Sequence, residues 1–182
     1  KAYRQSFLGK ECCILLEAKK YKKLIKYCDK IAKSTPDKDK LYGLYIYKGL
    51  ANYYADNYKE ALEYFNKTIK AKRDYTDAYL MKYYTEHLLG KTKQSIKNLQ
   101  KLIKKYPMNT LSYGYLLAIY YEKELYIDSI KLCNQYLKAQ KGNKCIYGHL
   151  AFAYKQLWDF ENFKLNYDKV FEINKNITKQ LL

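Results

Sequence analysis

The stretch Lys59–Phe65, KEALEYF, begins the series of segments that decides the fold of this 182-residue chain. Related segments follow at a constant spacing of 34 residues, with Ser95, Ser129 and Phe163 at the place of Ala61. Their apolar residues recur every three or four positions, which is the spacing of one face of a helix. A fixed period of this length predicts an array of structural repeats that pack on their neighbours.

A second pattern precedes these segments and indicates two helices in every repeat. Residues Tyr147–Tyr154 read Y-x-x-L-A-x-x-Y, and Tyr113–Tyr120 read Y-x-x-L-L-x-x-Y. Short turns such as Ala55–Asn57 and Leu89–Lys91 separate the two predicted helices. The sequence therefore predicts helix–turn–helix units at approximately residues 5–38, 42–75, 76–109, 110–143 and 144–177.

The period is interrupted near the start, and the pattern does not stop at the last unit. Leu24 and Ala61 are 37 residues apart, and the three extra residues fall in the polar segment Ser34–Lys40, where we expect a longer turn. Residues 178–182 read as the start of a further helix. Together with a first residue that is Lys1 and not Met, this favours a piece excised from a longer protein.

The units resemble the tetratricopeptide repeat, whose signature places a large apolar residue, Leu-Gly and Tyr before Ala, an aromatic residue and Pro. The resemblance covers about residues 5–177, and Pro36 and Pro107 stand where second helices should end. Lys48, Lys82 and Glu86 depart from the pattern because they replace apolar residues. The resemblance implies an all-α, right-handed solenoid that forms a single domain over residues 1–182.

The net charge of +17 raises the question of a nucleic-acid partner. Only Arg4 and Arg73 are arginines among 35 basic residues, and the lysines are spread along the chain, which argues against phosphate or base recognition. An RNA-binding helical-repeat module is kept as an alternative function. Exposed lysines are expected on the outer side of the second helices, at Lys67, Lys70, Lys97, Lys101, Lys104, Lys131 and Lys138.

No pattern in the chain predicts a catalytic group, a metal ligand set or a cofactor site, so we do not expect an enzyme. Cys145 and His149 share one helix face, but no third member of a catalytic or metal-binding set is visible. An odd count of five cysteines without Cys-x-x-Cys favours a reducing, cytoplasmic setting, and no apolar run is long enough to span a membrane. A non-catalytic subunit of a larger enzyme complex is the other alternative.

The resemblance also implies a concave groove lined by the first helix of each unit. An apolar or aromatic protein segment is the expected partner, while packing on further helices or self-association are the alternatives. The chaperone-type carboxylate clamp is not expected, because its places hold Ile46, Leu50, Met81, Leu111 and Tyr115. The predicted groove residues are Tyr47, Leu50, Tyr54, Leu80, Met81, Tyr84, His87, Tyr115, Ala118, Tyr121, His149 and Phe152.

Overall fold

The computed structural model describes residues 7–34, 41–140 and 142–181, and over these ranges the chain consists of ten α-helices without a strand. The predicted all-α repeat fold is confirmed. The helices are α2 (Phe7–Glu17), α3 (Tyr21–Ser34), α4 (Tyr42–Tyr54), α5 (Tyr58–Ala71), α6 (Thr76–Leu88), α7 (Thr92–Lys105), α8 (Thr110–Glu122), α9 (Tyr126–Ala139), α10 (Lys144–Gln156) and α11 (Phe160–Leu181).

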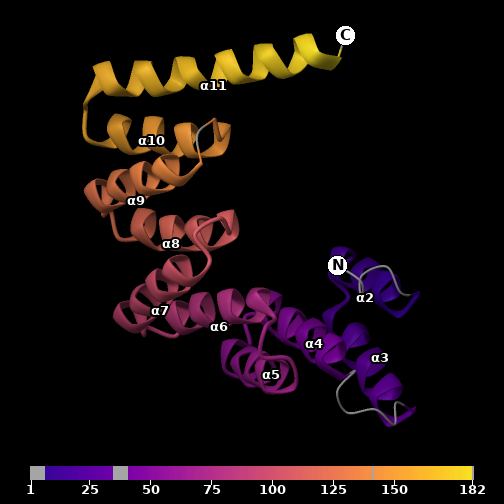
Figure 1. The fold of residues 1–182 in the computed structure, drawn as a ribbon. Coiled ribbons are helices and arrows are strands. Elements are labelled where there is room, and N and C mark those ends of the chain that lie inside the picture. Colours follow the sequence, from indigo (N-terminus) through magenta and orange to yellow (C-terminus); the bar gives the residue numbers. More distant parts are fainter. Residues whose placement is uncertain (1–6, 35–40, 141, 182) are drawn as a thin grey trace. The chain divides into compact units, whose positions relative to one another are not determined.

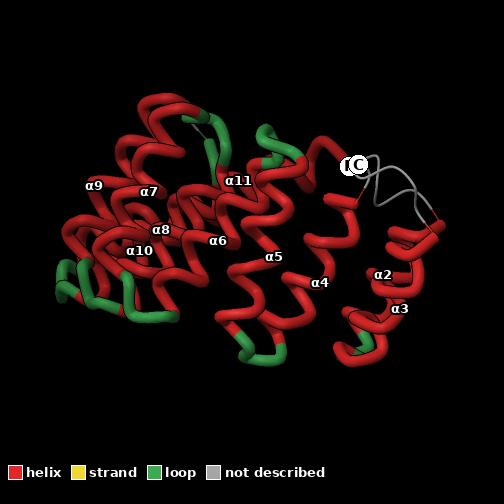
Figure 2. Tube along the Cα trace, turned by 90° about the horizontal axis from the view of Figure 1, so that it is seen from below, coloured by secondary structure: helices red, strands yellow, loops and turns green. Residues whose placement is uncertain are grey.

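The period seen in the sequence is repeated in the starts of the helices. The first helices α4, α6, α8 and α10 each begin 34 residues after the previous one, and so do the second helices α5, α7, α9 and α11. Short turns join the two helices of every pair (Figure 2). At the same place in each turn one residue has a positive φ, namely Lys19, Asp56, Gly90, Glu124 and Trp158. One turn geometry therefore serves all five pairs.

The chain divides into two compact units, Lys1–Ser95 and Ile96–Leu182, and the division falls within α7. In the first unit α4 packs on α3 and α5, and α5 packs on α6. In the second unit α9 packs on α8 and α10, and α11 lies along α10 (Figure 1). A single continuous domain over residues 1–182 stays a prediction.

Close packing inside a helix pair depends on small residues. In the pair α4–α5, a Cβ added to Gly49 would lie 2.5 Å from Cε1 of Phe65. Phe65 and Ala61 are both fully buried on α5. Ser95 has the place of Ala61 in α7, and its hydroxyl donates to the carbonyl oxygen of Tyr83 on α6 at 2.7 Å. The two helices of a pair thus approach each other where the sequence provides Gly, Ala or Ser.

The residues that depart from the repeat pattern have polar partners. Nζ of Lys48 lies 2.6 Å from Oδ1 of Asp29 on α3 and 4.3 Å from the ring centroid of Tyr64 on α5. Burial alone would lower the pKa of Lys48, but the bonds to Asp29 and Tyr64 outweigh burial and raise this pKa. In α6 the two departures pair with each other, since Lys82 and Glu86 lie 3.9 Å apart. The polar residues therefore fit the repeat without changing its helices.

The C-terminal end differs from the prediction. Residues 178–182 were expected to start a further helix, whereas α11 runs from Phe160 to Leu181 without a break. The segment 170–181 contains neither Gly nor Pro, so no residue in it forces the helix to end. At the other irregular place, the predicted longer turn and Pro36 fall in residues 35–40, which lie outside the described ranges. Pro107 follows the end of α7, as predicted.

Two glycines allow the turn geometry to be tested with opposite outcomes. Gly90 has φ +83°, a conformation that costs a residue with a Cβ about 1–2 kcal/mol, so Gly90→Ala should lower the free energy of unfolding. Gly114 lies inside α8, and Gly114→Ala should raise this free energy by about 0.5–1 kcal/mol. At both sites a Cβ would meet no described atom within 4 Å, so packing does not enter the comparison. Urea denaturation measures the change in the free energy of unfolding for both variants. Changes of the same sign would contradict the left-handed conformation assigned to Gly90.

The ion pair between α3 and α4 predicts an unequal response of its two members. The Lys48 side chain is 12% exposed, whereas the Asp29 side chain is 51% exposed. Asp29→Asn leaves a largely buried ammonium group without its counter-charge, so it should lower the melting temperature more than Lys48→Met, which leaves a solvated carboxylate. Thermal denaturation followed by circular dichroism gives the order. The reverse order would show that the pair does not determine the stability of this contact.

Candidate protein-binding surface

In the second unit, three of the predicted groove residues lie together. Tyr121 is on α8, and His149 and Phe152 are one turn apart on α10. The Tyr121 ring stacks on His149 with centroids 5.7 Å apart and meets Phe152 edge-on at 4.9 Å. Phe152 also faces Tyr126, the first residue of α9, at 6.5 Å. We call these four residues, Tyr121, Tyr126, His149 and Phe152, the aromatic cluster.

A hydrogen bond fixes the cluster to the backbone of α10. The hydroxyl of Tyr121 donates to the carbonyl oxygen of His149 at 3.1 Å. Burial raises the pKa of Tyr121, so the hydroxyl keeps its proton and stays a donor. Phe152 is 43% exposed, while Tyr121 and His149 are half-buried. The cluster therefore presents one open ring that is held in place by the rings beneath it.

The imidazole of His149 belongs to the apolar part of this surface. Burial lowers its pKa from the ordinary value of 6.5, because a buried ring is harder to charge. At neutral pH the ring is therefore uncharged. Tyr115 and Ala118, the other predicted residues of this unit, are half-buried on α8.

Four predicted groove residues of the first unit are buried, namely Tyr47, Leu80, Met81 and His87. The hydroxyl of Tyr47 lies 3.4 Å from the carbonyl oxygen of Gly9 and 3.2 Å from Sγ of Cys13, so it joins α4 to α2. Nδ1 of His87 lies 2.9 Å from Oγ1 of Thr92 and joins the ends of α6 and α7. These side chains hold the first unit together and offer little surface, in contrast to the place the sequence suggested for them.

Leu50, Tyr54 and Tyr84 remain accessible in the first unit. Tyr54 is 53% exposed, and its ring lies 6.2 Å from Tyr21 on α3 and 5.2 Å from Tyr53. Leu50 and Tyr84 are half-buried. The accessible aromatic surface of this unit is thus built around Tyr54 and includes the unpredicted rings of Tyr21 and Tyr53.

Two residues of the aromatic surfaces, Tyr21 and Tyr126, were not predicted, although a pattern in the sequence marks them. Four second helices begin with an aromatic residue, at Tyr21, Tyr58, Tyr126 and Phe160. Tyr21 and Tyr126 contact the aromatic residues Tyr54 and Phe152 of the first helix that follows. The aromatic residue at the start of a second helix is therefore part of the same surface as the first helices.

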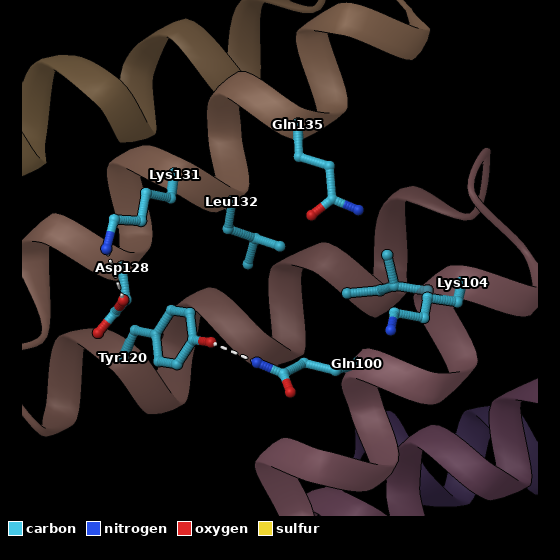
Figure 3. A pocket seen from close by; sticks show the side chains of 8 residues that line it. Gln100, Lys104, Tyr120, Asp128, Lys131, Leu132 and Gln135 are labelled. Atoms are coloured by element: carbon cyan, nitrogen blue, oxygen red, sulfur yellow. Dashed lines mark hydrogen bonds and ion pairs between the residues drawn. The ribbon is translucent and has the colours of Figure 1, made fainter.

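A separate hollow of about 340 Å³ lies between α7 and α9, above Tyr120 of α8 (Figure 3). Its polar lining includes Gln100, whose amide donates to the Tyr120 hydroxyl at 3.1 Å. Lys131 lies 3.7 Å from Asp128 at the rim. The lining mixes amide, ammonium and carboxylate groups with the apolar side chains of Ile103 and Leu132, whereas the aromatic cluster consists of rings alone.

The chemical groups of the chain do not form a metal centre in the part that the structure describes. No three His, Cys, Asp or Glu side chains come together there in a way that could hold an ion. The five cysteines are free thiols, and burial raises the pKa of Cys133 to about 12. Such a thiol stays protonated and behaves as a small apolar side chain. Among the described helices, none has the length and apolar character needed to cross a bilayer.

These features define a helical-repeat fold with an aromatic surface, and comparisons with known proteins agree with the fold. No protein-family model and no curated protein sequence matches the chain. Solved structures of MamA are similar to it. One MamA structure has a TM-score of 0.68 and 15% identity, and the match covers 96% of this chain and 98% of that chain.

Two further MamA structures show the same relation. MamA from residue 41 to its end, from Desulfovibrio magneticus RS-1, has a TM-score of 0.67 and 16% identity, with 93% of this chain and 94% of that chain covered. MamA AMB-1 has a TM-score of 0.62 and 14% identity, with 94% and 99% covered. At such low identity the likeness concerns the helical-repeat fold alone.

The lowered pKa of His149 predicts a pH-dependent stability. The unfolded imidazole titrates near 6.5 and the folded one lower, so protonation favours the unfolded chain. Stability should be complete above pH 6.5 and should decrease as the pH falls through 6.5 towards the folded value. Melting temperatures measured from about pH 7.5 to about pH 5.5 should show this loss in the wild type and less of it in His149→Phe. Equal slopes for the two proteins would contradict the prediction.

Proposed function

We propose that this chain is a scaffold of tetratricopeptide type that binds an apolar or aromatic segment of another protein. The binding surface would be the accessible side of the first helices, with the aromatic cluster at its centre in the second unit. The observation that carries this proposal is the partly exposed ring of Phe152, which meets the rings of Tyr121 and Tyr126 edge-on. The 34-residue recurrence of helix starts supports the repeat type.

The aromatic cluster has the physical properties of a binding anchor. Aromatic rings give a large contact area, and rings that are already fixed lose little conformational entropy when a partner binds. Tyr121 is fixed by its hydrogen bond, and Phe152 is in contact with two rings. An apolar side chain of the partner would cover the exposed part of Phe152 and remove it from water.

The side chains around the surface also limit the kind of partner. The places of a carboxylate clamp carry apolar or aromatic residues, of which Ile46 and Met81 are buried. Recognition would therefore depend on apolar side chains of the partner and not on its terminal carboxylate. The exposed lysines of the second helices, such as Lys97 and Lys131, would favour partners with acidic surfaces.

We also propose a non-catalytic role in a reducing compartment. The scaffold would act through contacts alone, with no cofactor. The five free cysteines, of which Cys12, Cys28 and Cys133 are buried, would stay reduced there. A cytoplasmic location is proposed on this ground.

Affinity capture from the native source tests the surface. Phe152→Ala should reduce the specifically captured protein by about tenfold or more, as expected when a central aromatic anchor is truncated. Its melting temperature should stay near that of the wild type, because Phe152 is 43% exposed. Lys97→Ala, on the exposed side of α7, is the matched control and should capture normally. Equal capture by Phe152→Ala and the wild type would contradict the proposal.

A second comparison separates binding residues from packing residues. Tyr84→Ala and Tyr115→Ala, at half-buried positions, should weaken capture with little loss of stability. Ala61→Leu should instead unfold more readily, by about 1–3 kcal/mol, because Ala61 is fully buried between two helices. If the tyrosine variants are as unstable as Ala61→Leu, those tyrosines are core residues and do not belong to the binding surface.

A further inference from the structure

The outer face of α11 is an apolar surface separate from the proposed binding surface. It carries Phe160, Lys164, Tyr167 and Phe171, which follow one another at intervals of four, three and four residues. This spacing places them in one stripe along the helix, as in the seam of a coiled coil. Tyr167 is 47% exposed, and Phe160 and Phe171 are each 56% exposed. Within the second unit, α11 packs on α10 (Figure 1), and Asn166 on the opposite side of α11 is buried.

Comparison with the other second helices shows what this face lacks. Tyr167 has the repeat position of Phe65, Leu99 and Cys133, all of which are fully buried. The Phe65 ring is about as large as the Tyr167 ring, so size does not explain the difference. In the first unit, α5 packs on both α4 and α6, and the Phe65 ring lies against Gly49 of α4. The exposed face of α11 therefore carries apolar residues of the kind that other second helices bury against neighbouring helices.

The charges on this face indicate what covers it. Lys164 and Asp168 are four residues apart, with Tyr167 between them, and both are exposed. If a second α11 lies antiparallel about a two-fold axis near residue 166, Lys164 of each copy faces Asp168 of the other. The same axis places Phe160 of one copy near Phe171 of the other. The face is thus complementary to itself in both charge and apolar surface, as a two-fold interface requires.

We propose that two copies of this chain associate through an antiparallel pair of α11 helices, with Tyr167 and the two Lys164–Asp168 ion pairs near the centre of the contact and a Phe160–Phe171 contact towards each end. The interface uses one helix of each copy, so it is small and the association is reversible. It leaves the aromatic cluster accessible, and each dimer would present two such clusters.

A head-to-tail contact between α11 of one copy and α2 of the next is disfavoured by charge. In the contact between α3 and α4, Asp29 pairs with Lys48. By repeat position, Asp168 corresponds to Asp29, and Glu11 of α2 corresponds to Lys48. A head-to-tail contact would therefore place two carboxylates where the intact contact has an ion pair.

Charge exchange tests the two-fold arrangement. Wild type should show a mass that rises from monomer to dimer with concentration in sedimentation equilibrium. Lys164→Asp alone and Asp168→Lys alone should each weaken association by about tenfold, since both ion pairs become repulsive. The double variant Lys164→Asp/Asp168→Lys should restore it, and an equal mixture of the two single variants should form heterodimers. Lys138→Asp, an exposed lysine of α9, is the charge control and should associate as the wild type does.

The apolar part of the contact has its own test. Phe171→Ala should weaken association by more than about tenfold while the melting temperature of the monomer hardly changes, because the ring is 56% exposed. The single tryptophan, Trp158, lies 5.9 Å from Phe160 and reports on the end of the contact. Its fluorescence should shift to shorter wavelength as the wild type associates, and this shift should be absent in Phe171→Ala.

Three results would overturn the proposal. The first is a monomer at every concentration. The second is an exchange series in which the double variant stays as weak as the single variants. The third is strengthening by Glu11→Lys with no effect of the changes at Lys164 and Asp168, which would show a head-to-tail contact. None of these results affects the capture of a partner protein through Phe152, so the binding proposal and the dimer proposal can fail separately.

Discussion

The close approach of the two helices within a pair is the constraint on which the other features of this chain depend. In the pair α4–α5, Gly49 lies directly against the ring of Phe65, and no side chain fits between them. This contact fixes how far apart the two helices lie and how they are turned. The rotation of each helix about its axis then decides which side chains face the other helix of the pair, the next pair or solvent. The packing within this pair therefore sets which of its side chains reach the surface.

The aromatic cluster shows how this constraint acts on the surface. The rings of Tyr121, His149 and Phe152 come from two successive first helices, and Tyr126 begins the second helix between them. They can stack because equivalent residues of successive pairs lie side by side. Much of the excess positive charge lies on second helices, at lysines such as Lys97 and Lys138. The repeat therefore places the aromatic rings of the cluster mainly on first helices and most of the exposed lysines on second helices.

Much of the fold could be predicted from the sequence, because helix starts and turns depend on local patterns of period 3.6 and on a fixed repeat length. Burial was harder to predict. The repeat pattern cannot show that the Tyr47 hydroxyl reaches Gly9, since that contact joins two pairs whose spacing is irregular. The new helix predicted at residues 178–182 was wrong, because a change in apolar pattern does not end a helix when no breaking residue is present. Tyr21 and Tyr126 were missed because they lie on second helices.

The turn shared by all five pairs has a consequence for how such a chain can change in length. The left-handed conformation is occupied by Gly90 but also by Lys19, Asp56, Glu124 and Trp158, so the turn forms with or without a Cβ at this place. A duplicated segment such as residues 110–143 would begin and end at the same helix boundaries as its neighbours. The array can therefore gain or lose a whole unit without a new loop, and its stability would change by the contribution of one unit and one contact.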